Sequence, residues 1–171
     1  MELSQRDFDE VELVGKLLMK IDNLDLAYVE SVMDDIQKRQ PFILSIISGL
    51  RMDVTPLELE EIVKLHFLIW DYFKSSKNVQ TIKITEELFE KVLKRNFALL
   101  QSAEGISEDQ QAILFGNDLQ NLKAKALMMA VLFRFKDHPA LKSMLKNLEF
   151  SVLLGMKALI ECLEIISTGK K

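Results

Sequence analysis

The sequence predicts a single all-α domain spanning residues 1–171, and three observations favour this fold class. The chain is 49% apolar and 28% charged, which is typical of a globular domain of this length with a buried core. It holds only six glycines and three prolines, so long helices with short turns are expected. Apolar residues recur every three or four positions, the period of an amphipathic helix. We expect about seven or eight helices in an irregular bundle or a solenoid-like stack.

The stretch 118–136 is the expected central helix of this domain. Residues 126–133 form an uninterrupted apolar run rich in Ala, Leu and Met, which are strong helix formers. A helix without polar side chains for two turns is expected to be surrounded by protein. The run is too short to cross a bilayer, which takes about 20 apolar residues. Gly116 leaves open whether 107–136 forms one kinked helix or two.

The other helices are indicated by start signals and apolar stripes. The first is expected from about residue 8 to 20, with one buried stripe of Phe8, Val11, Val14, Leu18 and Ile21. A second follows at 26–38. Proline at a first helical position and capping residues predict further starts at Pro41, Thr55, Thr85 and Ser107.

The C-terminal segment 139–167 could form one long helix that is apolar on most sides from residue 150 onward. Such a helix is expected either to insert beside the central helix or to pack against a second subunit. Gly155 lies in its middle and costs about 1 kcal/mol relative to alanine. We interpret this glycine as the mark of a close crossing with a neighbouring helix.

Two features bear on domain organisation. Residues 74–81, KSSKNVQT, are the most linker-like stretch, and they indicate a weak sub-division near 74–82. Residues 38–49 and 94–105 resemble each other, which either a duplicated helical pair or chance similarity between amphipathic helices would explain.

Charge is unevenly distributed along the chain. Residues 1–40 hold ten acids and five bases, a net charge of −5, and residues 121–171 hold nine bases and four acids, a net charge of +5. The acidic start could lie over the basic end within one subunit or across a dimer interface. Alternatively, both are solvated faces without a partner.

Catalytic and metal-binding motifs are absent from the sequence. It contains no G-x-x-x-x-G-K-[ST], C-x-x-C, H-E-x-x-H or G-x-S-x-G pattern. His66 is the best single candidate for chemistry, but Ile62 and Trp70 on the same face favour a core histidine. The Glu-x-x-His pair of di-iron bundles is missing because Val63 stands three residues earlier. We therefore assign no catalytic residue, cofactor or metal ligand.

The leading functional hypothesis is a non-enzymatic interaction or regulatory module that associates with itself through an apolar helix face. The apolar excess at 41–50 and 150–166 favours it. The single cysteine is typical of a cytoplasmic protein, and the pI of 5.3 argues against nucleic-acid binding. The residues expected at an interface or pocket are His66, Phe67, Trp70, Met128, Phe133, Phe150 and Leu154.

The alternative is a helical protein that binds a small molecule or lipid. Its apolar pocket would lie between helices and be lined by Phe67, Trp70, Met128 and Phe133. An enzyme is the third hypothesis, and it would have to combine His66 with carboxylates from other helices.

Overall fold

The computed structural model describes residues 5–169, which form ten helices and no strand, so the all-α prediction is confirmed. Two of the helices, α5 and α9, have only five and four residues, and the other eight match the expected number. In chain order the helices are α1 (Gln5–Asp22), α2 (Leu26–Arg39), α3 (Pro41–Leu50), α4 (Pro56–Phe73), α5 (Lys77–Thr81), α6 (Glu86–Ser102), α7 (Glu108–Asn121), α8 (Lys125–Asp137), α9 (Pro139–Lys142) and α10 (Lys146–Thr168).

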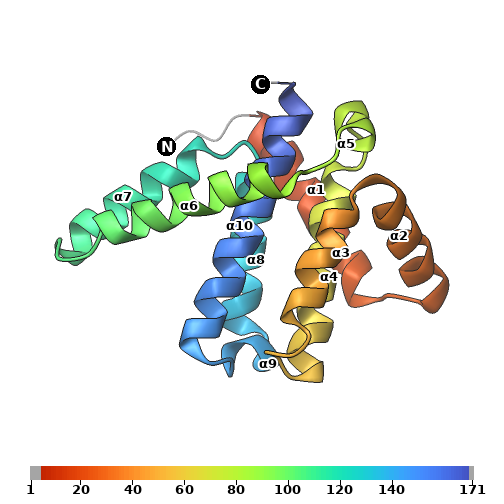
Figure 1. Ribbon diagram of the computed structural model, residues 1–171, viewed down its shortest axis with the longest axis horizontal. Coiled ribbons are helices and arrows are strands. Elements are labelled where there is room, and N and C mark those ends of the chain that lie inside the picture. The colour runs from red at the N-terminus through yellow and green to blue at the C-terminus, as the bar shows by residue number, and fades with distance from the viewer. Residues whose placement is uncertain (1–4, 170–171) are drawn as a thin grey trace.

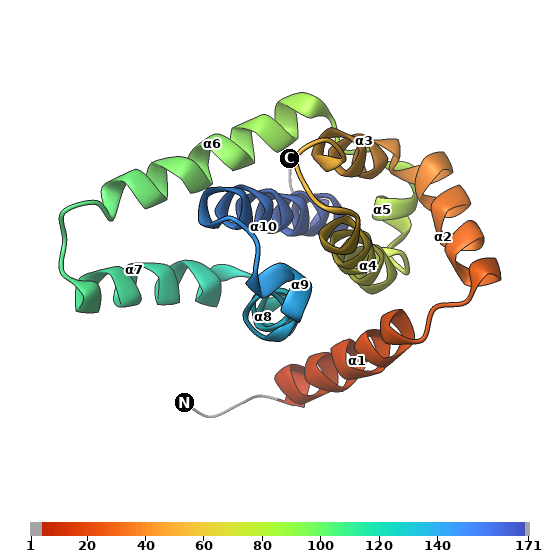
Figure 2. The same cartoon turned by 90° about the horizontal axis from the view of Figure 1, so that it is seen from below.

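Helices α4, α8 and α10 run side by side through the molecule (Figure 1). Seen from below, α10 lies between α6 and α8, while α4 lies between α3 and α1 (Figure 2). Helices α6 and α7 form an antiparallel hairpin that projects from this body (Figures 1 and 2). None of the helices within residues 5–169 has the length and apolar character needed to cross a membrane.

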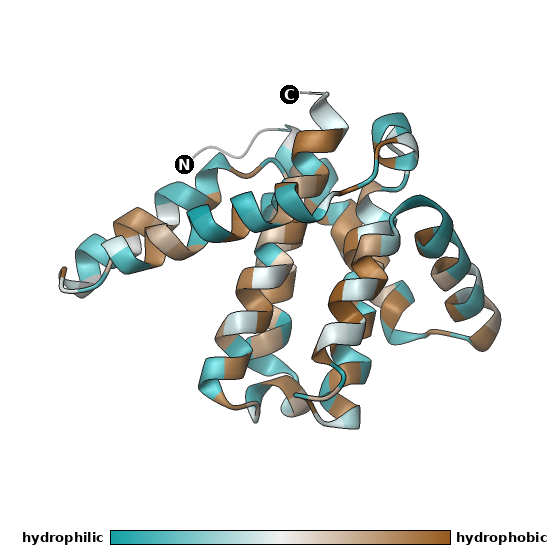
Figure 3. Ribbon diagram, in the orientation of Figure 1, coloured by the Kyte–Doolittle hydropathy of each residue, from teal (hydrophilic) through white to brown (hydrophobic). Residues whose placement is uncertain are grey.

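The most deeply buried helix is α4, in which every residue from Leu65 to Asp71 is buried. The expected capping box defines its start: the Thr55 hydroxyl accepts from the Glu58 amide at 3.3 Å, and the Glu58 carboxylate accepts from the Thr55 amide at 2.6 Å. Hydrophobic colour follows α4 and α10, whereas α2 and α5 are more hydrophilic (Figure 3). The centre of the core is therefore the pair of α4 and α10.

The prediction of one central helix over 118–136 is wrong. Residues 118–121 end α7, the chain is non-helical at 122–124, and α8 begins at Lys125, so 107–136 contains two helices. Helix α8 is also not surrounded by protein, because Met129 and Phe133 are 44% and 57% exposed. Its apolar run covers more of the helix circumference than the neighbouring helices bury.

The segment 139–167 is also divided, into α9 and α10, with Leu145 before the first turn of α10. Residues 158–163 are buried without interruption, since α10 packs against α4, α5, α6 and α8. The apolar C-terminal half of α10 is therefore buried within one subunit. It leaves little apolar surface for contact with a second subunit. A Cβ added at Gly155 would meet nothing within 4 Å, so this glycine does not mark a close helix crossing.

The linker-like stretch carries α5 and is tied to the body by one buried side chain. The Gln40 amide donates to the carbonyls of Val79 and Ile82 at 2.6 and 2.7 Å, and its oxygen accepts from the Ile84 amide at 2.9 Å. The similarity between 38–49 and 94–105 is not structural. The first segment is interrupted where α3 begins, whereas the second continues α6 to Ser102.

Candidate functional site: a groove between α1 and α8

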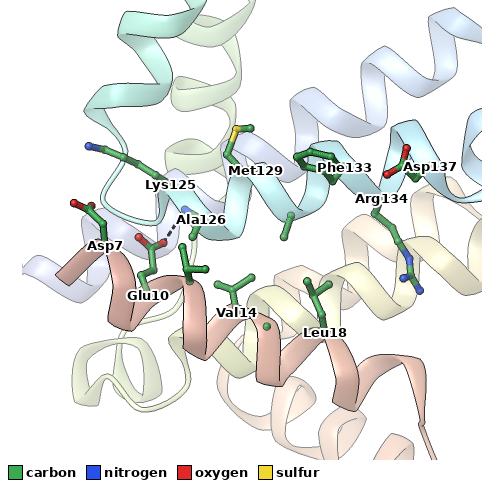
Figure 4. A pocket seen from close by; sticks show the side chains of 13 residues that line it. Asp7, Glu10, Val14, Leu18, Lys125, Ala126, Met129, Phe133, Arg134 and Asp137 are labelled. Carbon is green, nitrogen blue, oxygen red and sulfur yellow. Dashed lines mark hydrogen bonds between the residues drawn. The ribbon is translucent and has the colours of Figure 1, made fainter. Parts of the chain in front are cut away.

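A groove of about 610 Å³ runs between α1 and α8, two helices more than 100 residues apart in the chain (Figure 4). Val14 and Leu18 point from α1 toward α8, and Met129 and Phe133 lie along the opposite wall (Figure 4). Most of the groove is apolar, and charged side chains stand at its two ends. Its lining consists of Asp7, Glu10, Val11, Val14, Gly15, Leu18, Lys125, Ala126, Met129, Ala130, Phe133, Arg134 and Asp137.

Glu10 fixes one end of the groove by capping α8 from another helix. Its Oε1 accepts from the backbone amide of Ala126 at 3.0 Å and from the Tyr72 hydroxyl at 3.2 Å. Ala124, at the N-cap position of α8, provides no side-chain cap, so the first amides of α8 need acceptors from elsewhere. Glu164 of α10 is the second acceptor at this helix start, and its carboxylate accepts from the Ala124 amide at 2.6 Å.

Arg134 fixes the other end. Its guanidinium donates to Asp22 at the end of α1 and to Glu61 of α4, the latter at 2.9 Å. Burial raises the pKa of Glu61, but hydrogen bonds from Lys64 and Arg134 outweigh it, so the pKa lies below its usual range. Glu61 therefore stays ionised and holds Arg134 in place. The contacts of Arg134 and Glu10 hold the acidic helix α1 against α8 within one subunit.

Between these two ends the groove exposes large apolar side chains. The exposed fractions of Val11, Met129 and Phe133 are 58%, 44% and 57%. Phe8 and Met19, also on α1, are 56% and 64% exposed. The prediction that Phe8 and Val11 belong to a buried stripe is wrong, because only Val14 and Ile21 of that stripe are buried. Helix α1 has apolar residues around most of its circumference, and its neighbours cover only one side of it.

We call the groove, together with Phe8 and Met19, the α1–α8 face. Gly15 lies near the middle of α1 on this face, and a Cβ added there would meet nothing within 4 Å. The charge of α1 changes along its length. Residues 5–12 hold four acids and one base, a net charge of −3, whereas residues 13–22 hold two bases and one acid, a net charge of +1. The face is thus apolar in its centre and electrically polarised along its axis.

A second apolar cavity of about 250 Å³ lies where the α6–α7 hairpin meets α8 and α10. Three of the residues expected at an interface or pocket, Met128, Phe150 and Leu154, line it together. The polar lining residues of this cavity are Asn96, Asp118 and Lys157. The Lys157 ammonium donates to Asn96 at 2.9 Å and pairs with Asp118 at 2.9 Å and with Glu161 at 2.7 Å. Because all three of its donors are used, Lys157 has no free capacity for a ligand.

The remaining expected site residues lie elsewhere. Phe133 lines the α1–α8 groove, while Phe67 lies beside a separate groove near α2 and is itself fully buried. Trp70 is buried in the core, and its indole donates to Asp35 at 3.1 Å. His66 is at the wall of a third cavity between α3, α4, α6 and α10. The four residues of the predicted pocket therefore do not line one common space.

Sequence reasoning missed Glu10 and Gly15 as parts of a site, and it favoured a core position over a groove for Met129. The available signal was the excess of apolar residues on α1, where Leu13 and Met19 lie outside the predicted stripe. The capping role of Glu10 left no local signal, because its partner is 116 residues away.

The described residues contain no group of three or more His, Cys, Asp or Glu side chains placed to hold a metal ion. Comparison with protein-family models, curated protein sequences and solved structures found no match for this chain.

Proposed function

We propose that this protein is a non-enzymatic helical interaction module that pairs with a second copy of itself through the α1–α8 face. The observation that carries this proposal is the group of exposed apolar side chains on two helices held in fixed register. Val11, Met129 and Phe133 line one groove and are each more than 40% exposed. Apolar patches of this kind on a folded domain are typical of interaction surfaces.

The face is preorganised for binding, which lowers the entropic cost of association. Glu10 ties α1 to the first turn of α8, and Arg134 ties α8 to the last turn of α1. A partner therefore meets two helices that are already locked together. This geometry suits the docking of an amphipathic helix into an apolar groove.

A second copy of α1 is a partner with the required chemistry. It carries its own exposed apolar residues, Phe8, Val11 and Met19. If the two copies of α1 cross antiparallel about a two-fold axis, the acidic half of each lies beside the basic half of the other. A parallel crossing would instead place the two acidic halves together. Gly15, which has no side chain, lets the two backbones approach near the middle of the crossing.

A non-enzymatic role is supported by the state of the cysteine. Cys162 is fully buried, and burial raises the pKa of its thiol to about 12, so it is not a nucleophile at neutral pH.

The substitution Gly15→Gln tests the proposal because it has opposite effects on folding and on pairing. Glutamine is a better helix former than glycine by roughly 0.5–1 kcal/mol, and a Cβ at this position meets nothing within the subunit. The monomer should therefore become more stable to urea. The added side chain should hold the two α1 helices apart and weaken dimerisation at least tenfold in sedimentation velocity experiments.

Gly116→Gln is the matched control, since Gly116 lies in α7 away from the face and also has open space around its Cβ position. It should leave dimerisation unchanged. A wild-type protein that stays monomeric up to high micromolar concentration would contradict the proposal, as would a Gly15→Gln variant that pairs as tightly as the wild type.

A further inference from the structure

The groove beside Phe67, which we call the α2–α4 groove, lies where α2 and the end of α1 face α4 and has a volume of about 590 Å³. Phe67 is fully buried there. The apolar walls are half-buried side chains of the α1–α2 connection, α2 and α4, namely Leu24, Val29, Leu59 and Val63. On α4 the lining runs from Pro56 to Phe67, about 16 Å along the helix axis. This length matches about three turns of a docked helix.

Helix α2 extends the apolar surface beyond the groove. Leu26 and Met33 lie three positions before and four positions after Val29, so the three side chains share one face of α2. Leu26 is 74% exposed and Met33 is 36% exposed. The subunit therefore leaves an apolar stripe on α2 open beside the groove, and a docked amphipathic helix would cover both.

The surroundings of the groove are acidic. Asp22 and Glu60 line it, and the exposed acids Asp25 and Glu30 each follow a lining residue in the chain. This acidity distinguishes the α2–α4 groove from a surface suited to nucleic acid, which would need basic residues.

The basic groups at the groove are already engaged. The Lys64 ammonium pairs with the carboxylates of Glu60 and Glu61, each at 2.7 Å. Arg134 pairs with Asp22 and with Glu61. With Asp25 and Glu30, the groove and its rim hold five acids and two bases, a net charge of −3.

We infer that the α2–α4 groove binds an amphipathic helix of a partner protein that carries lysine or arginine beside its apolar stripe. The stripe lies against the apolar walls, and the basic side chains lie beside the acidic rim. The charge decides against two other occupants. A membrane surface is itself negatively charged. A second copy of α1 is acidic in its first half, with a net charge of −3 over residues 5–12. The partner is therefore additional to the second copy proposed for the α1–α8 face.

Two synthetic helical peptides test the charge requirement. Both have about 14 residues, or four turns, with leucine at the apolar positions. The remaining positions are lysine in one peptide and glutamate in the other. In fluorescence anisotropy titrations with the full chain at about 0.05 M salt, the lysine peptide should bind at least about tenfold more tightly. The difference should shrink at about 0.5 M salt, because screening weakens attraction between exposed charges.

Leu59→Gln tests the apolar wall, because it leaves the charge unchanged and glutamine is nearly as good a helix former as leucine. The variant should bind the lysine peptide at least about fivefold more weakly. Ile113→Gln is the matched control and should bind like the wild type. Ile113 is 64% exposed on α7, which lies at the opposite side of the molecule from α2 (Figure 1).

Glu30→Lys tests the acidic rim. It should weaken binding of the lysine peptide about three- to tenfold, because an attraction becomes a repulsion. Glu104→Lys makes the same charge change at an exposed position between α6 and α7, and it should alter the affinity by less than about twofold.

Equal binding of the two peptides, equal losses in Glu30→Lys and Glu104→Lys, or unchanged binding to Leu59→Gln would overturn the inference. A weakened dimer in Leu59→Gln would assign the groove to a second copy and would overturn it as well. So would binding of the full chain to phosphatidylserine vesicles that Leu59→Gln abolishes.

Discussion

His66 shows at the scale of one residue how position decides chemistry. An imidazole ordinarily titrates near neutrality, but this one is fully enclosed between α4 and its neighbours and remains uncharged. The sequence predicted a core histidine from Ile62 and Trp70 on the same helix face. It did not reveal the third cavity, which His66 borders, because the glycines that line it, Gly49 and Gly155, lie 17 and 89 positions away on other helices.

The stability of the fold should fall in mild acid because of this residue. The pKa of His66 is about 4 in the folded chain, whereas an imidazole in the unfolded chain has its ordinary pKa of 6.5, so between these pH values only the unfolded chain takes up the proton. The free energy of unfolding should therefore decrease by about 3 kcal/mol from pH 7 to pH 4. Urea denaturation of the wild type and of His66→Phe at several pH values measures this loss.

His66→Phe should lack the part of the loss that falls between pH 6.5 and 5. All other titratable groups are the same in both proteins, so the difference between the two pH curves reports on His66 alone. Parallel pH curves for the two proteins would show that His66 is not buried in its neutral form.

At the scale of the helix, starts that depend on neighbouring residues were predictable and starts that depend on distant ones were not. Thr55 and Ser107 begin capping boxes with residues three positions later, and both are present in the structure. The start of α8 depends on Glu10 and Glu164, which lie on α1 and α10. For this reason the eight apolar residues of 126–133 predicted a helix correctly but not where it begins.

Removing the Glu10 carboxylate should destabilise the fold through α8. Glu10→Ala leaves the Ala126 amide without its acceptor, and loss of a helix cap costs about 1–2 kcal/mol. Glu12→Ala is the matched control, because its carboxylate only forms an exposed pair with Lys16 and should contribute less than about 0.5 kcal/mol. Urea denaturation gives both values, and equal losses in the two variants would contradict the capping role.

At the scale of the whole molecule, composition and periodicity were sufficient to predict the fold class. They did not identify the core. The apolar run of 126–133 has the strongest local signal, yet α4 and α10 occupy the centre because other helices cover them on more sides. Burial of this kind depends on long-range packing, which a one-dimensional pattern does not contain. The same limit explains why Phe133, expected to share a pocket with Phe67, Trp70 and Met128, lies on an open face without them.

Polar contacts between helices complete the assembly. Asn96 of α6 and Glu161 of α10 are both buried, and the Asn96 amide donates to the Glu161 carboxylate at 2.6 Å. The Lys157 ammonium donates a hydrogen bond to each of them. These residues fasten the α6–α7 hairpin to the core. The α1–α8 face, in contrast, keeps Val11, Met129 and Phe133 exposed, and we propose a second copy of the chain as its partner.

Distances between nitroxide labels on the two copies test this pairing most directly. Cysteine is introduced singly at the exposed positions Asp9, Glu12 and Lys16, while the native Cys162 is fully buried and stays unlabelled. In an antiparallel crossing near Gly15, the separation of equivalent labels along the helix axis grows by about 3 Å per residue from the crossing, twice the helical rise. Asp9 and Glu12 therefore differ by about 9 Å in axial separation, and we expect a clearly longer distance at Asp9 than at Glu12. Equal distances at all three positions, or none between copies, would contradict the proposed pairing.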